Sequence, residues 1–147
     1  MAGQELNSKK PIDLSSYPLG TVGARVRELR TTTSNASDDN LRFVILHDFY
    51  HAITGQPFTN DAEEIVFRYQ PLFEDTYIRT KIAEKAGPLQ ANAQLAETII
   101  QGVKSYAGKA YRDLSLEEKL ALPMPLFESM PARIQVIEQA SAASFQR

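Results

Sequence analysis

The sequence predicts an all-α fold, a single-domain bundle of about six helices around one buried central helix. Apolar side chains recur at the helical spacing of three and four residues, and no stretch between turn signals alternates as a strand does. The chain has 147 residues, of which 43% are hydrophobic. That length and composition suit one domain with a single core, and we find no internal repeat.

The composition excludes several classes of protein. The net charge of −2 lacks the surplus of lysine and arginine that binding to nucleic acid requires. The absence of cysteine excludes disulfides and thiolate-bound zinc. No apolar run reaches the length of a membrane span, and we see no N-terminal targeting signal. We therefore expect a cytoplasmic protein, for which peripheral contact with the inner (plasma) membrane stays open.

The domain is predicted to begin after a polar N-terminal tail. Residues 1–16 form that tail, and residues 17–147 form the helical domain. The first helix is predicted over Gly20–Thr31, with Thr21 as its N-cap. Gly23 inside this helix has two explanations: close approach of a neighbouring element, which we favour, or contact with a ligand.

The second predicted helix, Leu41–Ile53, is the central one. Asp38 or Asp39 is predicted to cap it, and its only charged side chains are Arg42 and Asp48. A helix that is apolar around almost its whole circumference is buried. Polar groups on it are then buried as well, and a buried carboxylate needs a cation or strong hydrogen-bond donors.

The third helix is predicted to begin at a cap formed by Thr59 or Asn60, and Tyr69-Gln70-Pro71 predicts a kink or a boundary. A fourth helix is predicted over Leu72–Ala86. The side chains of this fourth helix that we expect to face the core are Phe73, Tyr77, Ile78 and Ile82.

The C-terminal part of the domain continues in helices. Leu89–Tyr106 is predicted as the next one, closed by Gly108. A capping box that starts at Ser115 predicts a short helix to Leu122. Prolines then interrupt the chain, and Ala132–Phe145 is predicted as a last, amphipathic helix.

The candidate site lies on the central helix and its successor. His47 and His51, the two histidines of the chain, stand four residues apart and so share one helix face. Asp48 follows His47 directly, and Glu63 comes twelve residues after His51 across a predicted turn. Two imidazoles and two carboxylates converging from adjacent helices predict a divalent metal site. Without thiolates such a set suits Zn²⁺, with iron and manganese as alternatives.

Plainer explanations exist for each of these residues. The histidines could be core residues bonded to carbonyls or tyrosines, and Glu63 could merely complement the dipole of its helix. Asp48 is either a direct ligand or a residue that orients a histidine. We favour metal binding because the residues occur together, and three or four protein ligands leave a coordination position open. Asp48 stands where zinc proteases need glutamate, and phosphohydrolases with adjacent His-Asp need further histidines.

The pattern His47-Asp48-x-x-His51, eleven residues, then Glu63 resembles the metal motif of the coenzyme Q biosynthesis protein 4 family. Upstream, Pro18-x-Gly-Thr-x-Gly23 is similar to a second motif of that family. The resemblance covers about residues 17–70, and Tyr50 stands where we expect the family to have tryptophan.

The resemblance implies a peripheral membrane protein of ubiquinone biosynthesis, a homodimer that organises partner enzymes. It implies removal of the C1 carboxyl from a polyprenylated hydroxybenzoate, with a metal on His47, Asp48, His51 and Glu63 as Lewis acid. The prenyl lipid would then lie in a groove between helices. From the helix faces we expect that groove to be lined by Phe43, Phe67, Phe73, Leu95 and Ile99.

Two other functions remain open on the sequence. One is a non-enzymatic prenyl-lipid-binding or scaffold protein in which the metal is structural. The other is a metal-dependent hydrolase or oxygenase of another kind, which two histidines and a carboxylate can also serve.

Overall fold

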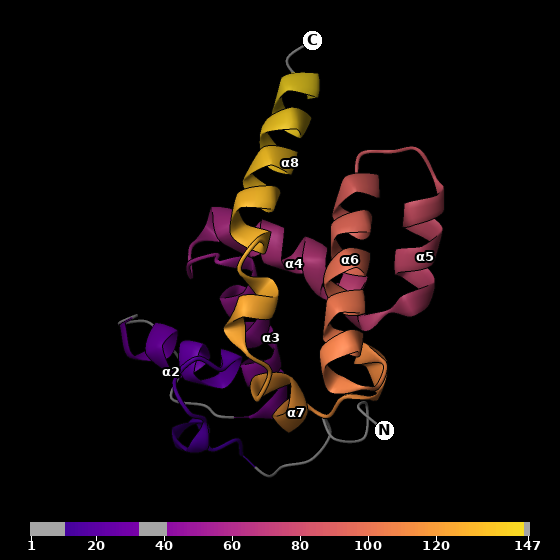
Figure 1. Ribbon diagram of the computed structural model, residues 1–147. Helices are drawn as coiled ribbons and strands as arrows, with labels where there is room; N and C mark the ends of the chain where they lie inside the picture. The colour runs from indigo at the N-terminus through magenta and orange to yellow at the C-terminus, as the bar shows by residue number, and fades with distance from the viewer. Residues whose placement is uncertain (1–10, 33–40, 146–147) are drawn as a thin grey trace.

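The computed structural model describes residues 11–32 and 41–145, and this part of the chain is all-α (Figure 1). It contains seven α-helices, three 3-10 turns and no strand. The predicted fold class is therefore confirmed. The helices are α2 (Val22–Thr32), α3 (Arg42–Thr54), α4 (Asn60–Glu74), α5 (Thr76–Glu84), α6 (Gln90–Ala107), α7 (Leu116–Leu120) and α8 (Met130–Phe145).

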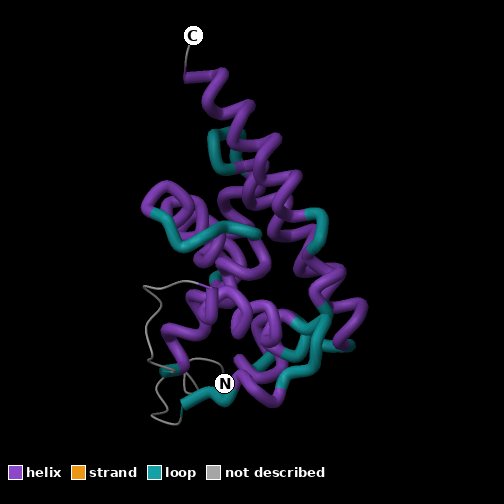
Figure 2. The backbone as a smooth tube through the Cα atoms, turned by 90° about the vertical axis from the view of Figure 1, so that its left-hand side faces the viewer, coloured by secondary structure: helices purple, strands orange, loops and turns teal. Residues whose placement is uncertain are grey.

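Helix α3 is the centre of the bundle, as predicted. It contacts α2, α4, α7 and α8, and most of its side chains are buried. Helices α5 and α6 pack side by side beyond α4, and the C-terminal part of α8 projects from the bundle in both views (Figures 1 and 2). Within the described residues, every helix is too short or too polar to cross a bilayer.

The fold begins earlier than the sequence indicated. Ile12 and Leu14 are buried in the core, so the predicted boundary at residue 17 is wrong. A guanidinium nitrogen of Arg27 donates to the main-chain oxygens of Leu14 and Tyr17, at 2.7 and 3.0 Å. Arg27 of α2 thus satisfies two main-chain acceptors beside these docked side chains.

The segment before α2 explains the glycine pattern found in the sequence. Gly20 has a φ of +92°, and the hydroxyl of Thr21 accepts a hydrogen bond from the amide of Ala24 at 3.2 Å, as the predicted cap requires. A Cβ on Gly23 would lie 2.5 Å from the ring of Tyr17. Of the two explanations for Gly23, the structure supports close packing.

The junction between α4 and α5 differs from the prediction. Helix α4 continues through Pro71 to Glu74, and the extended residue that separates the helices is Asp75. The carboxylate of Asp75 accepts from the amide of Ile78 at 3.1 Å and so caps α5. This shift turns Ile78 and Tyr77 outward, and the prediction that they face the core is wrong.

Most other predicted helix ends are confirmed. Thr59 caps α4, Ser115 forms a reciprocal capping box with Glu118 on α7, and Gly108 closes α6 in the left-handed conformation. The N-cap of α3 is Leu41, whose side chain makes no capping hydrogen bond. The predicted caps, Asp38 and Asp39, lie outside the described residues.

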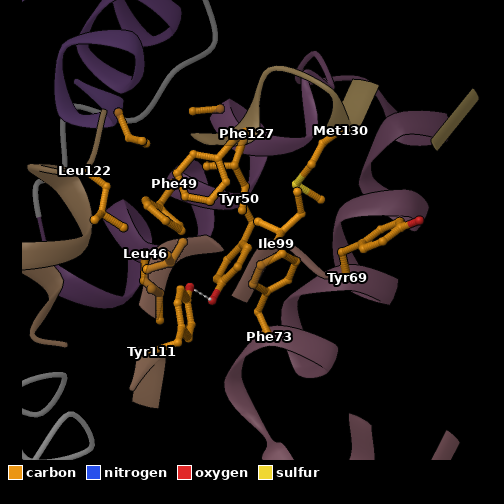
Figure 3. Close-up of a cluster of buried hydrophobic side chains, with 14 of the residues drawn as sticks. Leu46, Phe49, Tyr50, Tyr69, Phe73, Ile99, Tyr111, Leu122, Phe127 and Met130 are labelled. Atoms are coloured by element: carbon orange, nitrogen blue, oxygen red, sulfur yellow. Dashed lines mark hydrogen bonds between the residues drawn. The ribbon is translucent and has the colours of Figure 1, made fainter. Parts of the chain in front are cut away.

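The core is built on aromatic side chains of α3. Phe49 and Tyr50 pack edge to face, Phe49 meets Phe127, and Tyr50 meets Phe73 (Figure 3). The hydroxyls of Tyr50 and Tyr111 lie 2.6 Å apart inside this cluster (Figure 3). This aromatic packing holds α3 at the centre of the bundle.

Candidate metal centre

The candidate centre forms where the end of α3 meets the start of α4. Gly55 ends α3 with a φ of +70°, and the chain reverses into α4. This turn brings Glu63 against both histidines. The Nε2 atoms of His47 and His51 each lie 2.8 Å from a different carboxylate oxygen of Glu63. One ligand atom from each of the three residues lies within 4.8 Å of the other two, so the group can hold a metal ion.

The second nitrogen of each imidazole has its own partner. Nδ1 of His51 lies 3.0 Å from the main-chain oxygen of Gln56. Nδ1 of His47 lies 3.0 Å from Oε1 of the Gln70 side chain. Hydrogen bonds of this kind orient the rings of metal-binding histidines and leave the other nitrogen for the metal.

The donor set itself calls for a cation. A carbonyl oxygen only accepts, so Nδ1 of His51 carries a proton, and Nε2 of a neutral His51 then presents a lone pair to a carboxylate oxygen of Glu63. Either a further proton or a metal ion between these atoms removes the repulsion. Burial raises the pKa of Glu63, but hydrogen bonds and charges of His47 and His51 outweigh it, and the pKa lies below its ordinary value.

The centre is closed on one side and open on the other. His51 is fully buried and packs against Phe58 at a ring distance of 4.5 Å. The side chains of His47 and Glu63 are 25% and 30% exposed. Phe67 stacks on the outer face of His47 at 5.1 Å. A ligand can therefore reach a metal held here from the side of His47.

Asp48 does not belong to the centre, and its predicted role as a ligand is corrected. Its carboxylate lies 2.5 Å from a guanidinium nitrogen of Arg30, and both side chains are almost buried. Consecutive residues on a helix point about 100° apart, so Asp48 faces α2 while His47 faces α4. The group that can hold a metal ion is thus His47, His51 and Glu63.

An apolar groove opens beside His47. Its volume is about 730 Å³, and its lining residues come from α3, α4 and α5: Phe43, Leu46, His47, Phe67, Gln70, Pro71, Glu74, Asp75 and Ile78. Phe43 and Phe67 are 60% and 61% exposed, an unusual state for two neighbouring phenylalanines. Of the five predicted lining residues, these two face the groove. Phe73, Leu95 and Ile99 are buried in the core instead, because their helix faces point inward.

A second polar cluster lies on the same two helices and went unnoticed in the sequence. The Tyr50 hydroxyl donates to the carboxylate of Glu74, and Lys119 of α7 donates to the same oxygen at 3.0 Å. Tyr111 joins through its bond to Tyr50, and the Lys119 ammonium lies 4.7 Å from the Tyr111 ring centre. Burial, then the neighbouring hydroxyl and carboxylate, raise the pKa of Tyr50 well above 10.

Sequence reasoning also missed Gln70. The signal was present, since Gln70 follows Glu63 by seven residues, two turns along one helix face. It was hidden because Pro71 indicates a kink or a helix boundary at this point, whereas α4 continues past it.

A scan against models of protein families found no match for this chain, and searches of curated proteins and of solved structures found none either.

Proposed function

We propose that the protein binds a divalent metal at His47, His51 and Glu63 and presents it to an amphipathic ligand in the adjacent groove. One observation carries this proposal: the accessible edge of the centre, at His47, is also part of the wall of an apolar groove with two exposed phenylalanines. A buried structural metal would need neither the opening nor the groove.

We further propose Zn²⁺ as the metal. Two imidazoles and one carboxylate are the ligands of many catalytic zinc sites, and thiolates are absent from the chain. Iron and manganese accept the same ligands and are the alternatives. Three protein ligands leave a coordination position for water or a ligand oxygen, as catalytic sites do.

The motif resemblance supplies a candidate ligand, a polyprenylated hydroxybenzoate. The carboxyl or hydroxyl oxygens of its ring would lie at the metal, and its prenyl tail would lie against Phe43, Phe67 and Ile78. The metal would supply Lewis acidity to the loss of carbon dioxide from C1, where a proton from water would replace the carboxyl group. The side chains of the groove would exclude water and hold the ring against the centre. Peripheral membrane contact, a homodimer and partner enzymes stay predictions.

The first test is elemental analysis of purified protein, with mass spectrometry of any lipid that copurifies. We expect about one zinc per chain, and loss of that zinc in the double variant His47→Ala, His51→Ala. A protein that stays metal-free in the presence of equimolar zinc contradicts the proposed site. The two histidines would then be ordinary core residues.

The second test asks whether the groove binds the ligand. Binding of a short-chain prenylated hydroxybenzoate is measured by calorimetry with and without zinc, and release of carbon dioxide is assayed in parallel. We expect the variant Phe43→Ser, Ile78→Ser to weaken binding at least tenfold. Val136→Ser, a change at an apolar residue 65% exposed on α8 and outside the groove, is the matched control.

The outcomes separate the proposed functions. Zinc-dependent binding with carbon dioxide release supports the lyase. Zinc-dependent binding without any product supports the alternative, a non-enzymatic prenyl-lipid-binding or scaffold protein. Equal binding by both groove and control variants contradicts the groove as the ligand site.

A further inference from the structure

The two histidines of the centre are held by different kinds of hydrogen-bond partner. Nδ1 of His51 faces the main-chain oxygen of Gln56, and Nδ1 of His47 faces the side-chain amide of Gln70, both at 3.0 Å. Gln70 is half-buried on α4 and belongs to the groove wall. The side chains of Gln70 and Glu63 therefore hold His47 from its two ring nitrogens.

The difference in partner has a chemical consequence. A main-chain carbonyl only accepts, so a neutral His51 exists as the tautomer with the proton on Nδ1, and its Nε2 is ready for a metal. A side-chain amide offers an acceptor oxygen and a donor nitrogen, which a half-turn of the amide exchanges. Gln70 can thus pair with either tautomer of neutral His47.

Only one of these two pairings allows metal binding. With the amide oxygen of Gln70 toward the ring, Nδ1–H of His47 donates to it, and Nε2 carries a lone pair toward Glu63. With the amide nitrogen toward the ring, Nδ1 accepts instead. The proton then sits on Nε2, donates to Glu63, and blocks the ligand atom.

We infer that Gln70 is a positioning residue, whose amide oxygen selects the metal-binding tautomer of His47. The inference rests on the proposed metal site and deepens it. Partners of this kind outside the ligand shell change metal affinity by about 10–100-fold when they are removed. Phe67 cannot supply the selection, because its ring, stacked on His47, carries neither a hydrogen-bond donor nor an acceptor.

The test compares zinc affinities of two variants by competition with a chromophoric chelator. Gln70→Leu removes both polar groups at similar size, and we expect zinc to bind 10–100-fold more weakly. Gln70→Glu keeps an acceptor and removes the donor, so we expect affinity equal to or above that of the wild type. Gln94→Leu on the exposed face of α6 is the matched control and leaves affinity unchanged.

A spectroscopic readout separates positioning from a general loss of structure. Imidazole ¹⁵N shifts of the zinc-free protein are recorded at pH about 9, above the ordinary imidazole pKa of about 6.5. We expect Gln70→Leu to lose the preference of His47 for a proton on Nδ1, Gln70→Glu to keep it, and His51 to be unchanged in both.

Two results would overturn the inference in distinguishable ways. If the wild type binds zinc and Gln70→Leu binds it equally well, Gln70 has no positioning role while the metal site stands. If the wild type binds no zinc, the proposed function fails and the inference fails with it.

Discussion

Helices α3 and α4 carry two polar clusters that differ in the source of their positive charge. The cluster of Tyr50, Glu74, Tyr111 and Lys119 contains its own cation, the ammonium of Lys119, 3.0 Å from the Glu74 carboxylate. The cluster of His47, His51 and Glu63 contains a carboxylate and two imidazoles that carry no fixed charge. Both are built from side chains of α3 that meet a carboxylate of α4.

The difference shows how one helix pair can serve structure and binding. A compensating charge stabilises a partly buried carboxylate. Where a lysine from α7 supplies it, the cluster is complete, and it ties α3, α4 and α7 together. Where the described side chains supply none, protons or a metal ion from solution can provide the charge. The comparison therefore predicts that the first cluster governs the stability of the protein and the second responds to metal.

The largest change in stability is expected at the complete cluster, that of Tyr50, Glu74, Tyr111 and Lys119. Lys119→Met removes the ammonium and leaves the Glu74 carboxylate without its cation, so the free energy of unfolding should fall by about 3 kcal/mol. Urea denaturation followed by circular dichroism measures this. Lys109→Met is the matched control, because the pair of Lys109 with Glu118 is exposed, and its loss should cost under about 0.5 kcal/mol. Equal losses in the two variants contradict the structural role.

The next largest effect is expected at the cluster of His47, His51 and Glu63. Zinc at a free concentration of about 100 times its dissociation constant should raise the free energy of unfolding by about 2.7 kcal/mol, because it binds the folded state. Glu63→Gln should abolish this gain. Lys119→Met should keep it in full, since changes at separate sites add. A zinc effect that Glu63→Gln leaves unchanged places the ion elsewhere.

The two clusters also differ in how far the sequence predicts them. His47 and His51 share a face on any helix, and Glu63 follows across a short turn. Helical periodicity and the length of one loop are therefore enough to predict that the three side chains meet. Lys119 lies 45 residues from Glu74, and only the packing of α7 brings them together. Local patterns thus predicted the group of His47, His51 and Glu63 that can hold a metal, and they missed the cluster that depends on long-range contacts.

Contacts between residues far apart in the sequence also explain where the predictions differ from the structure. Asp48 follows His47 directly, but it faces α2, about 100° around α3 from His47, and its carboxylate pairs there with Arg30, eighteen residues away. Pro71 predicts a kink or a boundary because proline lacks an amide donor, and the structure continues α4 past it to Glu74, before the Asp75 cap of α5. Ile12 and Leu14 lie within a polar stretch, so composition alone hid their packing.

Asp48 gives a sharper test of which residues form the centre. Asp48→Asn keeps the shape and removes the charge that pairs with Arg30, so the free energy of unfolding should fall by about 2 kcal/mol. Zinc affinity, measured by chelator competition, should stay within about twofold of the wild type. A loss of more than about tenfold in affinity without a loss of stability would make Asp48 a ligand after all.

The smallest expected effect concerns alkaline pH and again separates the clusters. Burial, with the nearby Glu74 charge, raises the pKa of both Tyr50 and Tyr111 above the ordinary value of 10. The unfolded chain therefore releases these protons first as pH rises past about 10, and linkage requires stability to fall there. Below that pH their contribution is fully present.

Unfolding free energies between pH about 9 and 11 test this slope. Tyr50→Phe removes one of the two groups, so the decline with pH should become shallower even though the variant is less stable at neutral pH. Tyr106→Phe, at an exposed position on α6, should leave the slope unchanged. If Tyr106→Phe flattens the decline as much as Tyr50→Phe does, the tyrosines of the complete cluster have no special part in it. Saturating zinc should raise the free energy of unfolding at every pH. It should leave the difference in pH slope between Tyr50→Phe and Tyr106→Phe unchanged, because the candidate metal group contains neither tyrosine.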